Sequence, residues 1–400
     1  MVLVRGRARR QRPWRLRYHA QSAGRPPAFR YPLHLTIALA PLLLAACAHD
    51  KPFSGDDFGS DSTLTRGSDR QLTYNLGTDR TPAWRADGSG VLYMFEAIDE
   101  SPRDRCLGEL PPTGGTIRKT ICPFSTASLD SLDTLFEPSP GPSGQLLYLR
   151  EASPPDGITS NTAALVLAPD SSPLAATTIQ HYPYTAPNGK IHQGISNIRW
   201  LSETSVVYLA EKVLYLSPCG PCPIDTVRTG IEVVMVDLSG PAPTISIVPN
   251  TEDVSSLAVG ADSNQIYLTR NGDARVYLMT LSTGDVSVVH DFGPGVIARD
   301  VQIVGNRLFA ITLGRVSFVI DPTLGSVQED AGGQLNMVDL GSGNSSPLIV
   351  TGRFFRRPAA STTGDHLVAE AFPAVILSCG SICRDTTISK LADLWLFDIP

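Results

Sequence analysis

The sequence lacks the short motifs that identify many enzymes. It contains no G-x-S-x-G nucleophile elbow, no P-loop and no G-x-G-x-x-G turn. Histidines are sparse after residue 46, and none has the spacing of an H-E-x-x-H metal site. The acidic pieces Asp56-Asp57 and Ser60-Asp61-Ser62 lack the spacing of a calcium loop. The motifs therefore assign no catalytic residue, metal ligand or cofactor, although a site assembled from separate segments would leave no motif.

Long amphipathic helical stretches are also lacking. Short runs of β-branched and aromatic residues recur instead, interrupted by 34 glycines and 32 prolines, which indicates many short strands. This texture begins after Arg66 and continues to Pro400. Residues 47–65 are rich in Asp, Ser, Gly and Thr, and we expect a flexible tether there. We predict one all-β domain over residues 66–400, a length that would also fit two average domains.

Acidic residues are absent from the first 46 positions, which carry nine arginines. The apolar run Leu33–Ala46 follows, without Lys, Arg, Asp or Glu. A basic segment, a short apolar segment and a small-residue cleavage site indicate an export signal. The run is shorter than the ~20 residues of a transmembrane helix; an uncleaved anchor and a buried helix are the alternatives. Its end, Leu44-Ala45-Ala46-Cys47, resembles the bacterial lipobox, which implies removal of residues 1–46 and acylation of Cys47.

Removal of residues 1–46 changes the charge of the chain. It leaves 24 Lys and Arg against 39 Asp and Glu, a net charge of −15, so we expect no binding to nucleic acid. The basic segment before the apolar run is about 30 residues, several-fold longer than usual, which leaves open a start codon downstream of Met1. Ala48 stands where an Asp often marks inner-membrane retention in such lipoproteins. The resemblance therefore implies a lipid anchor at Cys47 in the outer membrane, facing the periplasm.

Apart from Cys47, the cysteines form three local pairs. These are Cys106/Cys122, Cys219/Cys222 and Cys379/Cys383. An even set of closely spaced cysteines in an exported chain is most simply three disulfides. Cys219-Gly220-Pro221-Cys222 has the thioredoxin active-site sequence, but that chemistry needs a helix N-terminus in a βαβ framework. The flanking sequence is β-rich instead, so we predict a loop disulfide, with a redox site and a metal site as alternatives.

The strand-like runs repeat along the chain. The expected second strands are Val91–Phe95, Leu146–Leu149, Val206–Leu209, Gln265–Leu268, Arg307–Thr312 and His366–Ala369. The expected third strands are Ala164–Pro169, Val233–Leu238, Val276–Leu281, Leu335–Leu340 and Leu394–Ile399. The expected fourth strands are Ala176–His181, Thr244–Val248, Val286–His290 and Pro347–Val350. The second strands recur every ~40–60 residues, which is the spacing of propeller blades.

One unit carries a recognisable motif. It combines Leu72-Thr73, Asp79 and Pro82-Ala83-Trp84-Arg85-Ala86-Asp87-Gly88 with a following apolar strand. This pattern resembles the WD40-like repeat of TolB-type β-propellers, in which Ser usually stands at the position of Arg85. Looser copies occur at Glu137–Pro140 and Ile198–Leu201. The resemblance implies a propeller and no catalytic residues. In such a unit we expect Trp84 to pack between neighbouring sheets and Asp87-Gly88 to form a hairpin turn.

The two ends of the domain are complementary. The sequence stops at Pro400 directly after a third strand, Asp393–Ile399, whereas Gln71–Asn75 is a fourth strand ahead of the first blade. Pairing these two strands completes six four-stranded blades and hides both sheet edges. We therefore predict a six-bladed β-propeller closed by the N-terminal strand. Seven blades, an irregular count, and a sandwich or two-domain fold are the alternatives.

Each cysteine pair lies between an expected second and third strand. Such connections emerge on one face of a propeller, so we predict three long, disulfide-bonded loops on one face and short turns on the other. Ordered loops on a rigid scaffold commonly bind partners; protection of the loops against proteolysis is the alternative.

Two functions of different class fit these features. The first is a non-catalytic, monomeric scaffold in the cell envelope that binds an envelope protein or a glycan. TolB-type propellers associate with envelope lipoproteins, but this chain has no room for their N-terminal α/β domain, so we do not expect the role of TolB itself. The second is a lactonase-like propeller hydrolase, whose channel would need Glu, Asn and Asp on a metal; the sequence does not single out those residues. A thiol-disulfide oxidoreductase through Cys219/Cys222 is a more remote alternative.

Overall fold

The computed structural model describes residues between positions 69 and 399, which all belong to the unit Pro52–Pro400. The described residues are 69–73, 78–96, 105–115, 117–122, 132–153, 162–216, 225–313, 318–319, 329–330, 332–350, 353–373, 386–387 and 392–399. The predicted signal, Cys47, the tether, Cys219, Cys222, Cys379 and Cys383 lie outside them. Within the described ranges, no helix has the length and apolar character needed to cross a bilayer.

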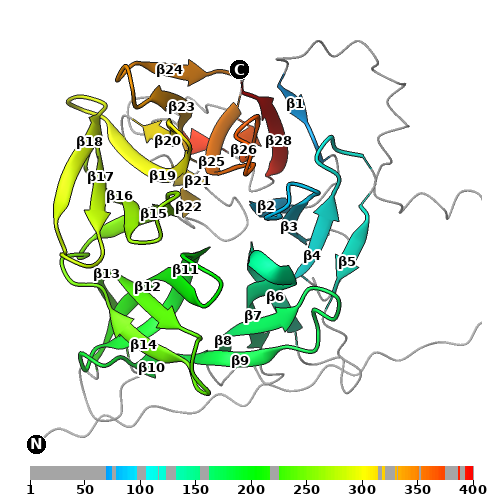
Figure 1. Cartoon of the computed structure of the whole chain (residues 1–400), viewed down its shortest axis with the longest axis vertical. Coiled ribbons are helices and arrows are strands. Elements are labelled where there is room, and N and C mark those ends of the chain that lie inside the picture. The colour runs from blue at the N-terminus through cyan, green and yellow to red at the C-terminus, as the bar shows by residue number, and fades with distance from the viewer. Residues whose placement is uncertain are drawn as a thin grey trace, which may run out of the picture. The chain divides into compact units, whose positions relative to one another are not determined.

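The described strands form antiparallel blades arranged in a ring around a central channel (Figure 1). The strands are given from the channel outward. Blade 1 is β2 (Thr78–Trp84), β3 (Val91–Glu96), β4 (Arg105–Leu110) and β5 (Lys119–Ile121). Blade 2 is β6 (Leu132–Pro140), β7 (Gln145–Ser153), β8 (Thr162–Pro169) and β9 (Thr177–Tyr182). Blades 1 and 2 share one eight-stranded sheet, because the third strand of blade 1 pairs in parallel with the first strand of blade 2 at Arg105 and Thr134. Blade 3 is β11 (Ile191–Trp200), β12 (Ser205–Leu216), β13 (Asp225–Asp237) and β14 (Thr244–Ile247), with the short β10 (Tyr184–Thr185) beside β11.

Blades 4 to 6 continue the ring in chain order. Blade 4 is β15 (Val254–Val259), β16 (Gln265–Arg270), β17 (Arg275–Thr280) and β18 (Val286–Asp291). Blade 5 is β19 (Ile297–Val304), β20 (Arg307–Leu313), β23 (Gln334–Asp339) and β24 (Ser345–Leu348). Blade 6 is β25 (Arg353–Ala360), β26 (His366–Pro373), β28 (Asp393–Asp398) and β1 (Arg70–Gln71). The predicted β-propeller is therefore confirmed, its arrangement is consistent with six blades, and each strand predicted from the repeats overlaps an observed strand.

Each blade buries both of its faces against its neighbours. Strand β12 illustrates the period of two, because Val206 and Tyr208 pack towards blade 2 whereas Val207 and Leu209 pack towards blade 4. Six apolar clusters fill the six blade interfaces. In ring order they join Leu92 with Tyr148, Leu149 with Tyr208, Val207 with Leu257, Ala258 with Val301, Phe309 with Phe355, and Val368 with Trp84. This mutual burial stabilises the ring, since no blade can cover both its faces alone.

The tryptophans of the repeat motif lie between blades, as predicted. Trp84 is buried in the cluster between blades 6 and 1, and its Nε1–H donates to the Ala359 carbonyl at 2.9 Å. Trp200, in the loosest copy of the motif, donates to the Ser139 carbonyl of blade 2 at 3.0 Å. Gly141 is required beside it, because a Cβ there would lie 2.5 Å from the indole ring. Each indole thus fixes one blade to its predecessor.

The N-terminal strand closes the ring, as predicted. β1 pairs antiparallel with β28, with Arg70 opposite Leu396 and Gln71 opposite Trp395. The pairing continues beyond the strand, where the Leu72 N–H donates to the Leu394 carbonyl at 2.7 Å. The Leu394 N–H in turn donates to the Thr73 hydroxyl at 2.9 Å. The last blade is therefore completed by residues more than 300 positions away in the sequence.

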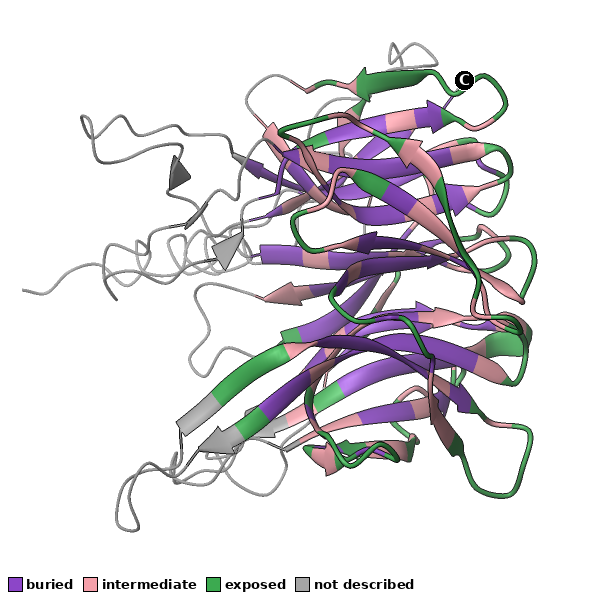
Figure 2. Ribbon diagram, turned by 90° about the vertical axis from the view of Figure 1, so that its left-hand side faces the viewer, coloured by how far each residue is buried: buried purple, intermediate pink, exposed green. Residues whose placement is uncertain are grey.

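The two faces of the propeller differ in their connections. Short hairpin turns join first to second and third to fourth strands, and Figure 2 shows these exposed turns together on one face, as predicted. Asp87-Gly88 lies in such a turn, with Gly88 at φ 71°. On the other face, the connections within blades 5 and 6 pair with each other. There β21 (Phe318–Val319) pairs with β22 (Glu329–Asp330) and, in parallel, with β27 (Thr386–Thr387).

The position predicted for one cysteine pair is wrong. Cys106 and Cys122 are joined by a disulfide, but Cys106 lies within β4 and Cys122 directly follows β5. The bond therefore links the third and fourth strands of blade 1 and does not bridge a connection between the second and third strands. The cause is that β4, which contains Gly108 and Glu109, was not identified from the sequence. The other two pairs lie outside the described residues and stay predictions.

Candidate functional site in the central channel

The innermost strands of five blades share a β-bulge with a strained residue. In each bulge one non-glycine residue has a left-handed backbone. These residues are Thr81 (φ 54°), Glu137 (52°), Asn197 (53°), Asp300 (50°) and Arg357 (45°). Such conformations are uncommon outside glycine, cost about 1–3 kcal/mol each and cluster at functional sites. A bulge changes the direction of a side chain, so these five residues leave the regular alternation of their strands.

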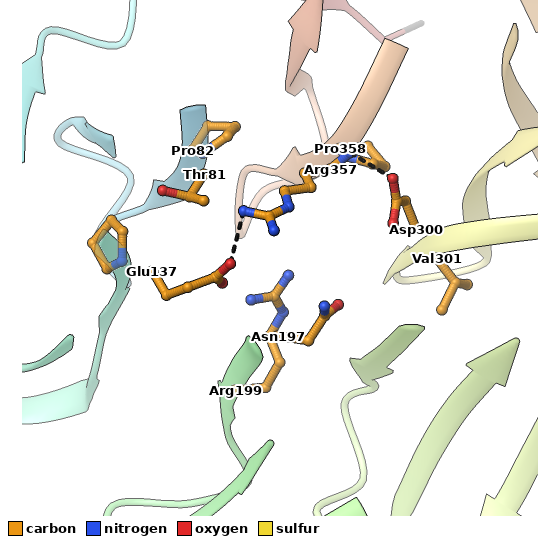
Figure 3. A pocket seen from close by; sticks show the side chains of 10 residues that line it. Thr81, Pro82, Glu137, Asn197, Arg199, Asp300, Val301, Arg357 and Pro358 are labelled. Carbon is orange, nitrogen blue, oxygen red and sulfur yellow. Dashed lines mark hydrogen bonds and ion pairs between the residues drawn. The ribbon is translucent and has the colours of Figure 1, made fainter. Parts of the chain in front are cut away.

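All five line one cavity on the axis of the propeller (Figure 3). Arg199 of β11 lines it as well, together with Pro82, Pro138, Val301 and Pro358. The cavity volume is about 20 Å³, which is somewhat more than the roughly 10–15 Å³ that one water needs, so only a very small group fits. The lining therefore comes from blades 1, 2, 3, 5 and 6, and the ionisable groups in it are two arginines and two carboxylates.

An ion pair crosses the channel. Arg357 Nη1 of blade 6 lies 2.7 Å from Glu137 Oε1 of blade 2, and Figure 3 shows the two side chains reaching towards each other past blade 1. Glu370 of β26 supports the same arginine, with its Oε1 at 3.8 Å. Glu370 also accepts the backbone N–H of Thr81 at 2.6 Å. Side chains and backbone of three blades are thus held together by two carboxylates.

Asp300 anchors a second group of arginines. Its Oδ2 accepts the backbone N–H of Arg357 at 3.1 Å and lies 3.9 Å from Nε of both Arg299 and Arg356. Burial raises the pKa of the Asp300 carboxyl, but the attraction of these arginines and the hydrogen bond outweigh it, so the pKa lies below its ordinary value. Asp300 is therefore an ionised, hydrogen-bonded group.

Arg199 differs from the other channel arginines. Its guanidinium donates from Nη1 to the neighbouring Ile198 carbonyl at 2.9 Å, and within the described part of the chain no carboxylate oxygen is within 4 Å of it. Burial lowers the pKa of Arg199, and repulsion from Arg357 adds to this effect, whereas Glu137 and Asp300 act in the opposite direction. The positive charge of Arg199 is therefore only partly compensated.

The channel contains the residue types that the hydrolase alternative requires, but its two carboxylates already interact with arginines. Glu137, Asn197 and Asp300 all line the cavity. Glu137 is paired with Arg357 and Asp300 faces three arginines. In the described ranges, no three His, Cys, Asp or Glu side chains are grouped as metal ligands. Guanidinium groups within ion-pair distance of these carboxylates would also repel a divalent cation.

A second polar cluster lies inside blade 3. His192 is fully buried; its Nε2 lies 2.7 Å from Glu232 Oε1 and its Nδ1 lies 3.0 Å from the Tyr184 hydroxyl. Lys212 Nζ lies 3.4 Å from Glu232 Oε2. Burial lowers the pKa of His192 more than Glu232 raises it. A neutral imidazole between a carboxylate and a phenol is satisfied on both nitrogens, so this cluster stabilises the blade.

Comparison with known proteins assigns no family to this chain. No protein-family model and no curated protein matches the sequence. The propeller domain of the trilobed protease from Pyrococcus furiosus is 10% identical, with a TM-score of 0.46 over 82% of this chain and 95% of that one. TolB from Acinetobacter baumannii is 13% identical, with a TM-score of 0.41 over 74% of this chain and 60% of that one. A gluconolactonase from Xanthomonas campestris is 11% identical, with a TM-score of 0.47 over 88% of this chain and 94% of that one. With TM-scores below 0.5, these likenesses assign neither a family nor a function, and the propeller fold rests on the strands described above.

None of the strained channel residues could be assigned a role from the sequence motifs. A signal was nevertheless present, because three of the five strained residues directly precede a proline in the first strand. These are Thr81-Pro82, Glu137-Pro138 and Arg357-Pro358. The first two lie in the segments already assigned to the repeat motif. In blades 1, 2 and 6, the residue before that proline lines the channel cavity.

Proposed function

We propose that this protein is a non-catalytic β-propeller scaffold, lipid-anchored in the cell envelope, that binds an envelope protein or glycan. The observation that supports it most directly is the ion pairing in the channel. A hydrolytic propeller needs carboxylates that hold a metal or move a proton. Here Glu137 and Asp300 are engaged by Arg357 and its neighbours. These carboxylates hold the blades together.

The size of the channel cavity supports the same proposal. A volume of about 20 Å³ cannot contain a sugar lactone or a peptide, because small-molecule sites generally measure roughly 300–1,000 Å³. Binding of a large partner would therefore take place on a face of the propeller. The face opposite the short turns has the longer connections, two of which pair through β21 and β27. Rigid scaffolds commonly bind partners through such connections.

The envelope location rests on the sequence. The export signal and the Leu-Ala-Ala-Cys47 end resemble those of bacterial lipoproteins. The net charge of −15 after removal of residues 1–46 argues against nucleic acid as a partner. Replacement of Cys47 by alanine would prevent acylation, and the protein should then leave the membrane fraction.

In-cell cross-linking of the full chain, followed by affinity capture, tests the scaffold. We expect one dominant envelope partner with the wild type, and the same partner with the channel variant Asp300→Asn provided that it folds. The Cys47→Ala variant is the matched control for membrane attachment, and its capture should fall. Absence of a specific partner, or lactone hydrolysis that Asp300→Asn abolishes, would contradict the proposal.

The second candidate is a propeller hydrolase with a metal in the channel. The observation in its favour is that Glu137, Asn197 and Asp300 come from three blades to one cavity. It requires Arg357 to release Glu137 when a cation binds. Stoichiometric calcium in the purified protein, lost in Glu137→Gln, would establish this candidate; metal-free protein that remains so after incubation with calcium would eliminate it.

A further inference from the structure

Arg199 is placed in the channel without a carboxylate of its own. Figure 3 shows its guanidinium extending from β11 towards the ion pair of Glu137 and Arg357, on the side of Asn197. The carboxylate of Glu137, which lines the same cavity, is already paired with Arg357, whose Nη1 lies 2.7 Å from Glu137 Oε1. Among the described residues, Arg199 makes a single hydrogen bond, to its neighbour's carbonyl. Since a guanidinium has five N–H donors, most of its donors remain available to another group in the cavity.

Thr81 is a second, independent indication of a ligand. The residue is only 7% exposed, and its hydroxyl oxygen is buried without a hydrogen-bond partner among the described residues. A buried hydroxyl normally has a partner, because leaving it unpaired is unfavourable. Thr81 lines the same cavity as Arg199, and it is held there in a strained conformation. Asn197, also in the lining, adds a side-chain amide.

We propose that the channel cavity is a binding site for one carboxylate group, held by the guanidinium of Arg199, the hydroxyl of Thr81 and the amide of Asn197. A guanidinium matches the two oxygens of a carboxylate in a planar, bidentate pair. A divalent cation is disfavoured by Arg199 and Arg357. A dianion such as phosphate is disfavoured because Glu137 and Asp300 line the same cavity and would repel its second charge.

The size of the cavity selects the ligand further. About 20 Å³ accommodates the head of a carboxylate, with the rest of a larger molecule outside the described lining. Formate is therefore the smallest complete probe, and acetate tests whether one added methyl group is tolerated. This site does not depend on which partner binds the face of the propeller, so its failure would leave the proposed scaffold function untouched.

The test is NMR of ¹³C-formate with the full chain at pH 7 in buffer without other small carboxylates. Broadening of the formate signal, titrated to saturation, gives the dissociation constant. We expect Arg199→Gln to weaken binding roughly tenfold or more, as loss of a charge-assisted hydrogen bond does. Thr81→Val keeps the shape of the side chain and should weaken binding several-fold. Arg228→Gln is the matched control, because Arg228 lies in the same blade with its side chain 57% exposed, and it should bind as the wild type does.

Each outcome decides the proposal. Saturable formate binding that Arg199→Gln and Thr81→Val weaken, and Arg228→Gln does not, supports it. No saturable binding by the wild type overturns it, and so does equal binding by Arg199→Gln. Chloride that displaces formate at equal concentration would overturn the assignment to carboxylate. Where Arg199→Gln fails to fold, Arg199→Lys keeps the charge without the planar fork and should bind formate measurably more weakly than the wild type.

Discussion

Removal of the cross-channel ion pair should measurably destabilise the propeller. The substitutions are Glu137→Gln and Arg357→Gln, singly and together. Glutamine keeps most of the volume of each side chain and removes its charge. The pair joins blade 2 to blade 6, which are not neighbours in the ring. Its loss therefore tests whether the channel side chains contribute to stability in addition to the apolar blade interfaces.

The burial of the two side chains sets the expected magnitude. Glu137 is 10% and Arg357 29% exposed, at a separation of 2.7 Å. Fully exposed pairs are worth about 0–1 kcal/mol, whereas loss of one partner from a buried pair costs about 3–5 kcal/mol. Arg357 retains Glu370 at 3.8 Å, so part of the interaction survives. We expect a coupling free energy of about 2 kcal/mol, between these limits.

The assay is urea unfolding of the four proteins at pH 7, analysed as a double-mutant cycle. The matched control is the pair Arg228–Glu211 in blade 3, at 2.8 Å with side chains 57% and 37% exposed. Its coupling should be below about 1 kcal/mol and should fall with added salt. A Glu137–Arg357 coupling no larger than that of the control pair would refute the reasoning, because burial would then have no effect.

Three further predictions concern parts of the molecule away from the channel. Thr73→Val removes the acceptor of the Leu394 N–H in the closing strand and should lower the free energy of unfolding by about 1–3 kcal/mol, measured in urea. His192 has a pKa below its ordinary value in the folded protein, so the unfolded chain binds a proton first as the pH falls below ~6.5. Stability should therefore fall on acidification, by at most ~1.4 kcal/mol per pH unit, and His192→Gln should remove that contribution between pH 5 and 7. Serine at both Cys106 and Cys122, which are separated by 16 positions, should cost about 3 kcal/mol.

Each of these predictions has its own control. Thr244→Val, at an exposed position of β14, should leave stability within about 0.5 kcal/mol of the wild type. His181 is exposed, and His181→Gln should keep the wild-type pH dependence; an unchanged slope in His192→Gln would contradict the assignment. Reductant should destabilise the serine variant less than the wild type, because the variant already lacks the Cys106–Cys122 bond. A wild type that loses no stability in reductant would show that the disulfide contributes little.

The sequence was sufficient to predict the blades because their signals are local. Strands such as β12 show apolar residues on both faces, and turn-forming residues separate them. Strand β4 was missed because Gly108 and Glu109 have low strand propensity. Contacts with residues elsewhere in the fold explain why these two residues stand in the strand. A Cβ on Gly108 would lie 2.8 Å from the Tyr93 ring, and Glu109 accepts two hydrogen bonds from Arg85 at 2.9 and 2.6 Å.

Arg85 is also the position at which the motif departs from the TolB-type pattern. Its Nη1 lies 2.6 Å from Asp170 Oδ2 in the turn that follows β8, while its Nε and Nη2 bind Glu109 within blade 1. One guanidinium therefore links blades 1 and 2 in this chain. Serine is too short to make this connection. The departure has a structural cause that becomes visible only once Asp170, 85 positions away, is placed beside it.

The channel could not be predicted because its residues are joined by backbone geometry and not by sequence spacing. Alternation alone would assign every second residue of β2, β6 or β25 to one face of its blade. The bulge breaks that alternation at Thr81, Glu137 and Arg357, and the inserted residue points along neither face. The backbone strain at these positions is the cost of bringing charged groups onto the axis. A cluster that served only to fill the axis could be built from unstrained apolar side chains, so the repetition of strain in five blades favours a ligand-binding role for this cavity.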